Sequence, residues 1–203
     1  MDMQGYRALA ITQQQAWDAL NNPAVLKACI PGCDKVEPTG ENQYAVGMAL
    51  KIGPVAAKFA GKILLSDIVA PESYKINFEG QGGVAGFGKG TAEVRLKPDG
   101  SGCALDYTVH ATVGGKVAQL GQRLIDGTAK SMAEDFFKRF DEAMQQAHPE
   151  AYAARDAALA SAGTDGAVAV ADAGGSAGQG GGIPAWVWIA GGVAVLAVWW
   201  FSR

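Results

Sequence analysis

The longest periodic segment of the chain is a helical pattern over residues 115–147, which contains no proline. Apolar positions recur there every three or four residues, the spacing that places side chains on one face of a helix. They are Val117, Leu120, Leu124, Thr128, Met132, Phe136, Phe140 and Ala143. A helix of this length would extend roughly 50 Å. It would need a wide surface to cover its apolar face.

The preceding chain changes to a period of two, which is typical of half-buried strands. Strand-like runs occupy residues 3–11, 34–38, 42–52, 55–69, 73–80, 86–97 and 103–113. Helices are predicted between the first run and the second, and all later connections are short turns rich in Gly and Pro. These turns are too short for the crossovers that parallel strands need. The last run alternates most clearly, with Leu105, Tyr107 and Val109 on one face and Asp106 and His110 on the other. We expect an antiparallel meander with one face turned toward the long helix.

Two short helices are predicted between the first and second strands. Thr12 is a suitable N-cap, with Gln15 three residues later as its capping-box partner. Asn22-Pro23 then ends this helix and begins another over residues 23–29, because proline is favoured in the first turn.

These elements predict an α+β fold for residues 1–148: a curved antiparallel sheet of about seven strands around a long C-terminal helix. Glycines within the strands, such as Gly61 and Gly88, are suited to bends or bulges. A cavity is expected between the sheet and the helix, with walls suited to an apolar, aromatic-bodied ligand. The candidate ligand-contacting residues are Trp17, Phe59, Phe78, Phe87, Tyr107, Leu120, Leu124 and Met132.

The C-terminal part differs in composition. Residues 149–182 are rich in Ala and Gly and are predicted to form a flexible linker, with a short helical stretch at its start. Residues 183–203 include a charge-free apolar run long enough to cross a bilayer as a helix. Tryptophans lie near both of its ends, as expected at two membrane interfaces: Trp186, Trp188, Trp199 and Trp200. A single-pass tail anchor is therefore predicted.

Composition narrows the possible partners and the compartment. The formal net charge of −3 gives no electrostatic basis for nucleic-acid binding. The start of the chain lacks a secretory signal pattern, and Cys29, Cys33 and Cys103 are an odd number of cysteines. We therefore expect free thiols and a globular part facing the cytoplasm, held at the inner membrane by the tail.

No catalytic or metal-binding pattern is recognisable. His110 and His148 have no neighbouring residues at the spacing of a triad or a metal site. Residues 83–89 match the start of a phosphate loop, G-x-x-x-x-G-K, but Gly90 replaces the required Ser or Thr and a strand pattern follows. We interpret residues 80–90 as a flexible hairpin at the cavity mouth, and expect no metal and no catalysis.

Several short segments, in their order and spacing, resemble the CoxG-type family of carbon monoxide dehydrogenase subunits over about residues 1–145. They are ACIPGC (28–33), KIGPV (51–55), FAGK (59–62), the glycine-rich 80–90 and GGKVAQLG (114–121). The resemblance implies a helix-grip fold of the START-like (SRPBCC) superfamily, whose members bind lipophilic ligands.

The resemblance also implies a function. It is that of a non-catalytic accessory that recruits an aerobic molybdenum-containing carbon monoxide dehydrogenase, or a related molybdenum hydroxylase, to the cytoplasmic membrane. A bound quinone, ubiquinone or menaquinone, would link that enzyme to the respiratory chain. Two alternatives remain open: a purely structural recruiter without a ligand, and a START-like enzyme acting on a lipid or polyketide. The absence of a convergent His/Asp or His/Glu set argues against the enzyme.

Overall fold

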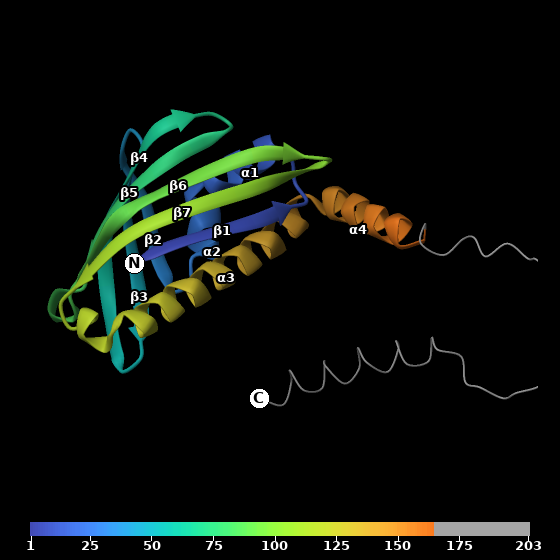
Figure 1. Ribbon diagram of the computed structural model, residues 1–203. Helices are drawn as coiled ribbons and strands as arrows, with labels where there is room; N and C mark the ends of the chain where they lie inside the picture. Colours follow the sequence, from blue (N-terminus) through green and yellow to red (C-terminus); the bar gives the residue numbers. More distant parts are fainter. Residues whose placement is uncertain (165–203) are drawn as a thin grey trace, which may run out of the picture. The chain divides into compact units, whose positions relative to one another are not determined.

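The computed structural model describes residues 1–164, and these form an α+β domain built on one seven-stranded antiparallel sheet (Figure 1). The strand order is β1-β7-β6-β5-β4-β3-β2. The strands are β1 (Asp2–Leu9), β2 (Cys33–Gly40), β3 (Gln43–Ile52), β4 (Val55–Val69), β5 (Ser73–Gln81), β6 (Phe87–Asp99) and β7 (Gly102–Gly114). The predicted antiparallel meander is confirmed, and the first strand, β1, pairs with the last strand, β7.

The two short helices lie where the capping residues predicted them. Helix α1 (Gln13–Leu20) begins after Thr12, whose side chain accepts from the Gln15 N–H while the Gln15 side chain reaches back to the cap. Helix α2 (Pro23–Cys29) begins after Asn22, with Pro23 in its first turn. Both helices pack at one end of the sheet, beside the buried side chains of the larger core, which include Ile11, Leu96 and Leu105.

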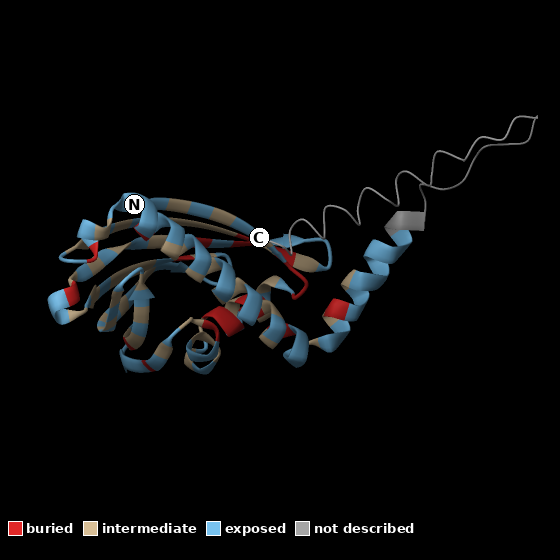
Figure 2. Ribbon diagram, turned by 90° about the horizontal axis from the view of Figure 1, so that it is seen from below, coloured by how far each residue is buried: buried red, intermediate tan, exposed pale blue. Residues whose placement is uncertain are grey.

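The long helix α3 (Gln122–Ala147) lies against the concave side of the sheet, and its opposite side is exposed along its length (Figure 2). The prediction that it begins at residue 115 was wrong. Gly115 packs directly on Gly86, so closely that a Cβ at either position would clash with the other segment. The chain then forms only a 3-10 turn, η2 (Ala118–Leu120), and Gly121 adopts a positive φ of 88° before α3 starts. The 26 residues of α3 span roughly 39 Å.

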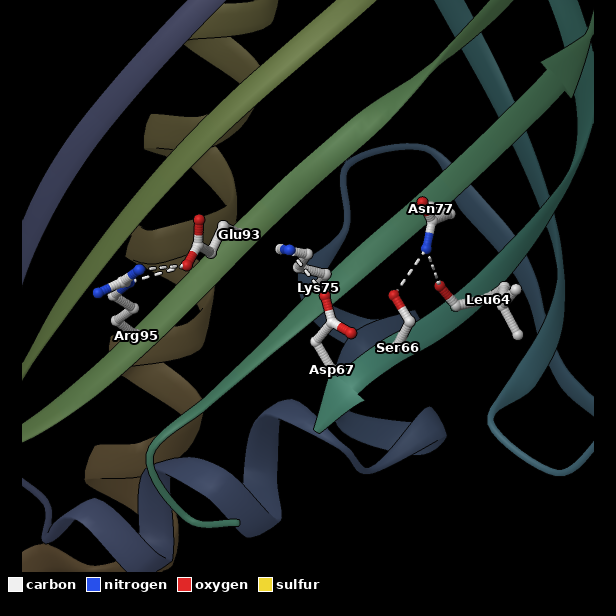
Figure 3. Close-up of polar contacts among 7 residues, drawn as sticks. All are labelled: Leu64, Ser66, Asp67, Lys75, Asn77, Glu93 and Arg95. Carbon is white, nitrogen blue, oxygen red and sulfur yellow. Dashed lines mark hydrogen bonds and ion pairs between the residues drawn. The ribbon is translucent and has the colours of Figure 1, made fainter. Parts of the chain in front are cut away.

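The convex side of the sheet is polar and carries its own contacts between side chains. Exposed ion pairs and amide hydrogen bonds of this kind hold side chains in place but add little stability. They join Asn77 to Ser66 and Leu64, Lys75 to Asp67, and Arg95 to Glu93 (Figure 3).

Helix α4 (Pro149–Thr164) occupies the first part of the predicted linker. Its Tyr152 is 2 % exposed, belongs to the larger core and donates a hydrogen bond to Asp141 of α3 at 2.6 Å. Among residues 1–164, no helix is both long and apolar enough to cross a bilayer. The rest of the predicted linker, 165–182, and the predicted anchor, 183–203, lie outside the described residues, so the anchor stays a prediction.

Candidate ligand cavity

Apolar space lies between the concave face of the sheet and α3, in two adjoining lobes. The inner lobe, near α1 and α2, has a volume of about 290 Å³, and the outer lobe, toward the start of α3, about 440 Å³. The lobes share wall residues on five strands: Val46, Ile63, Ile76, Ala92 and Val109. The same side chains therefore border both lobes.

A row of glycines forms the floor of the outer lobe. Gly61 of β4 pairs with Gly80 of β5, and Gly80 pairs with Gly88 of β6, so the three lie side by side across the sheet. All three line the lobe, and a Cβ added at Gly88 would meet no atom within 4 Å. The absence of side chains along this row leaves the space that the lobe occupies. The ladder is continuous through these pairs, so Gly61 and Gly88 are not bulge residues.

Three segments converge at the open end of the outer lobe. The short helix η1 (Gly83–Ala85) is joined to the chain before η2 by a hydrogen bond from the Val117 N–H to the Ala85 carbonyl oxygen, 2.9 Å long. Ile125 of α3 and Ile52 at the β3–β4 turn pack with them in a small second core. Gly80, Phe87 and Gly88 of the glycine-rich segment line this lobe, and the segment leads into a strand rather than a helix, as predicted.

Aromatic side chains of the sheet and α3 surround the inner lobe. Tyr107 of β7 stacks on Phe137 of α3 with ring centroids 5.4 Å apart, and Phe136 lies beside Phe137 on the helix. Tyr74 of β5 and Tyr44 of β3 complete the aromatic wall. Burial raises the pKa of the Tyr74 phenol well above its ordinary value, because the phenolate would be poorly solvated there. The inner lobe therefore holds a neutral phenol at ordinary pH.

Comparison with known proteins places this fold in a family. The family model for CoxG, a subunit of carbon monoxide dehydrogenase, matches residues 5–145. The chain belongs to the CoxG family of carbon monoxide dehydrogenase subunits. The match covers most of β1, the other six strands in full and nearly all of α3, so nearly all of the lining of both lobes lies within the part that is common to the CoxG family. No curated protein sequence matches the chain.

Solved structures share the CoxG-family fold. A conserved protein from Geobacillus kaustophilus is 35% identical, with a TM-score of 0.68, over 72% of this chain and 96% of that one. A Thermus thermophilus protein is 12% identical with a TM-score of 0.55, covering 72% and 99%. A Chromobacterium violaceum protein is 15% identical with a TM-score of 0.53, covering 70% and 95%. The last two show the fold alone.

The structure places the eight predicted contact residues of this CoxG-family chain in different surroundings. Phe59, Phe78 and Phe87 line the outer lobe, and Tyr107 lines the inner lobe. Trp17 packs in the larger core with its ring edge against Tyr74, at 5.3 Å between centroids. The other three lie outside the lining of both lobes: Leu120, Leu124 and Met132.

Leu120 lies in η2, before α3 begins, and the predicted spacing of four residues from Leu124 to Phe140 drifts around a helix that has 3.6 residues per turn. Leu124 is 40 % exposed and lies near Gly53 of the β3–β4 turn, while its neighbour Ile125 faces the outer lobe. Farther along α3, the helix contributes Ala133, Phe136 and Phe137 to the inner lobe. The adjacent Phe136 and Phe137 were the available sequence signal for this wall. The glycine row had no sequence signal, because it depends on a strand register that was not known from the sequence.

The side chains considered for catalysis lie apart from the cavity. His110 is exposed on the convex face and pairs with Asp2 at 2.6 Å, and His148 follows α3 beside Gln15. The three cysteines are free thiols. Within residues 1–164, no group of three or more metal-ligating side chains comes together. The two lobes offer binding of an apolar molecule, and neither His110 nor His148 belongs to their lining.

Proposed function

We propose that this protein is a non-catalytic accessory to a molybdenum-containing carbon monoxide dehydrogenase, or a related molybdenum hydroxylase, and that its cavity carries a quinone. The observation that carries the proposal is the two-lobed apolar cavity within a domain of the CoxG family. The glycine floor and the aromatic walls suit a flat ring with an apolar tail, since rings gain from stacking on aromatic side chains.

Membrane attachment is the second part of the proposal, through residues 183–203 as a tail anchor. The surface of the cavity mouth supports a position at a bilayer, because it exposes large apolar side chains. Val84 is 85 % exposed and Phe87 is 44 % exposed. Exposed basic side chains on neighbouring segments, Lys58, Lys116 and Arg123, carry charge that anionic lipid headgroups attract. A quinone would then pass between bilayer and cavity without crossing open water.

Reconstitution tests this function. The dehydrogenase is added to vesicles that contain the full chain and a membrane quinone, under carbon monoxide and without oxygen. Oxidation of carbon monoxide with water releases two electrons and two protons for each carbon dioxide formed, and reduction of a quinone to its quinol takes up both. We expect quinol formation to depend on the chain and to fall to the rate of chain-free vesicles when residues 183–203 are removed.

A cavity variant separates the carrier from a purely structural recruiter. Gly88→Leu fills the outer lobe but leaves the tail and the outer surface unchanged. If the protein carries quinone, this variant still brings the dehydrogenase to the vesicles but no longer supports quinol formation. Full quinol formation by Gly88→Leu would favour the recruiter without a ligand. If vesicle binding and quinol formation by the dehydrogenase were the same with and without the chain, the accessory function itself would be contradicted.

A further inference from the structure

Two tyrosine hydroxyl groups are the notable polar feature of the inner lobe. Tyr74 is only 4 % exposed and lines the lobe, yet its hydroxyl makes no hydrogen bond with any described residue. Tyr44 lines the same lobe, and its hydroxyl likewise has no partner among residues 1–164. Both side chains belong to the lining of this one lobe, whose volume is about 290 Å³.

Among residues 1–164, the fully buried side-chain polar atom without a partner is the Nε of Arg7, so the unpaired Tyr74 hydroxyl keeps accessible surface that a hydrogen-bond acceptor in the lobe can contact. The other polar side chains that line the inner lobe either have a hydrogen-bond partner or lie against another part of the sheet. The Asn21 amide donates to the Trp17 carbonyl oxygen at 2.9 Å. Tyr107 lies over the edge strand, where a Cβ at Gly5 would clash with its ring and hydroxyl. Among the described residues that line the inner lobe, Tyr74 and Tyr44 are therefore the unpaired donors that do not lie against the edge strand.

We propose that Tyr74 and Tyr44 bind an acceptor oxygen of the ligand, which fixes its polar head in the inner lobe. The apolar remainder then lies over the glycine row and extends toward the mouth. This inference rests on the proposed function, since it assigns an orientation to the ligand of the same cavity. It adds the residues that recognise the head group and the chemical class of that group.

The lining of the inner lobe limits the head group to a neutral one. Its residues include no Lys, Arg or His, and the walls are otherwise apolar or aromatic. A carboxylate there would lose its hydration without gaining a cation, which costs far more than a hydroxyl–carbonyl hydrogen bond returns. A neutral carbonyl on an apolar ring, as in a quinone, fits the two donors. A fatty acid does not.

A matched pair of ligands and a matched pair of variants test the inference. Menadione carries quinone oxygens on a methylated naphthalene ring, and methylnaphthalene has the same ring without them. Both are titrated calorimetrically into the full chain in lipid nanodiscs, with empty nanodiscs to correct for partitioning. Tyr74→Phe removes only the buried hydroxyl, and Tyr6→Phe makes the same change at a residue that is 55 % exposed.

We expect Tyr74→Phe to weaken menadione binding about three- to tenfold, as for loss of one hydrogen bond. Methylnaphthalene binding should stay unchanged, and Tyr6→Phe should change neither. In the infrared spectrum, the carbonyl stretch of bound menadione should move back toward its value in apolar solvent.

Each contrary result has a distinct meaning. Equal weakening of both ligands by Tyr74→Phe would show that the ring shape matters and not the hydroxyl, and would overturn the inference. Unchanged menadione binding, with an unchanged carbonyl stretch, would overturn it as well while leaving a ligand-carrying cavity. If the unsubstituted chain bound neither ligand, the proposed function itself would fail, and the inference with it.

Discussion

Replacing Gly88 by leucine is the change that most directly opposes a ligand in the outer lobe. The position lies on the concave face of β6, between cross-strand partners Gly80 and Val113. Its added Cβ would meet no atom within 4 Å, so the side chain enters the lobe without displacing the backbone. The perturbation therefore fills space and leaves the fold intact.

The expected magnitude follows from the area that the leucine buries. Full burial of a leucine side chain is worth about 1.5–3 kcal/mol, and removing a glycine from a strand interior adds roughly 0.5–1 kcal/mol. The ligand-free variant should gain about 2–4 kcal/mol in free energy of unfolding. A ligand excluded from the same space should lose about 2–3 kcal/mol of apolar burial, which is about 30- to 150-fold in Kd.

The assay is calorimetric titration of a short-tailed quinone into the full chain in lipid nanodiscs, with thermal unfolding measured on the same samples. Thr91→Leu is the control, because Thr91 lies on the same strand but on the exposed convex face. It should change affinity little. Unchanged affinity in Gly88→Leu, together with the expected gain in stability, would refute the placement of the ligand in the outer lobe.

Three further outcomes are expected. Phe140→Ala, at a side chain that is 0 % exposed and stacks on Phe136, should lower the free energy of unfolding by about 3–5 kcal/mol; a loss below about 1 kcal/mol in denaturant titration would contradict the packing described. Burial raises the pKa of both Tyr74 and Tyr152, and the hydrogen bond to Asp141 adds to the effect at Tyr152. The folded state keeps these phenols neutral, whereas the same tyrosines in the unfolded chain ionise at about pH 10. This contribution to stability is therefore present below that pH and is lost as the pH rises above it. A melting temperature that stayed constant through alkaline pH would argue against burial of both. Removal of residues 183–203 should shift the protein from the membrane to the soluble fraction after cell lysis, and full retention in the membrane pellet would exclude the tail as the main anchor.

The sheet was predictable because its local signals agree with its long-range contacts. Turns such as Gly53-Pro54 and Pro98-Asp99-Gly100 divide the chain into alternating runs, and the observed strands follow them closely. The face assignment of β7 is also confirmed, since Leu105, Tyr107 and Val109 line the inner lobe. Period-two alternation fixes which side chains share a face whatever the pairing partner is.

The sequence predicted that a cavity exists, but it identified only some of the residues that line the cavity. The start of α3 depends on the contact between Gly86 and Gly115, which are distant in sequence, so local periodicity extended the predicted helix too far toward the N-terminus. Leu124 was assigned to the wrong face because a spacing of four residues drifts around a helix of 3.6 residues per turn. The glycine floor depends on strand register, which places Gly61 beside Gly80. Register is set by the whole pattern of pairing and not by any one glycine.

The central claim is that the space between sheet and α3 holds an apolar ligand, and photolabelling tests it most directly. The full chain in lipid nanodiscs is irradiated with a photoreactive short-tailed quinone, and the modified residues are identified by peptide mass spectrometry. We predict labels on wall residues that the two lobes share, such as Ile76, Ala92 and Val109, which excess unlabelled quinone should suppress. Labels confined to the convex face, or labels insensitive to competition, would contradict a ligand-carrying cavity.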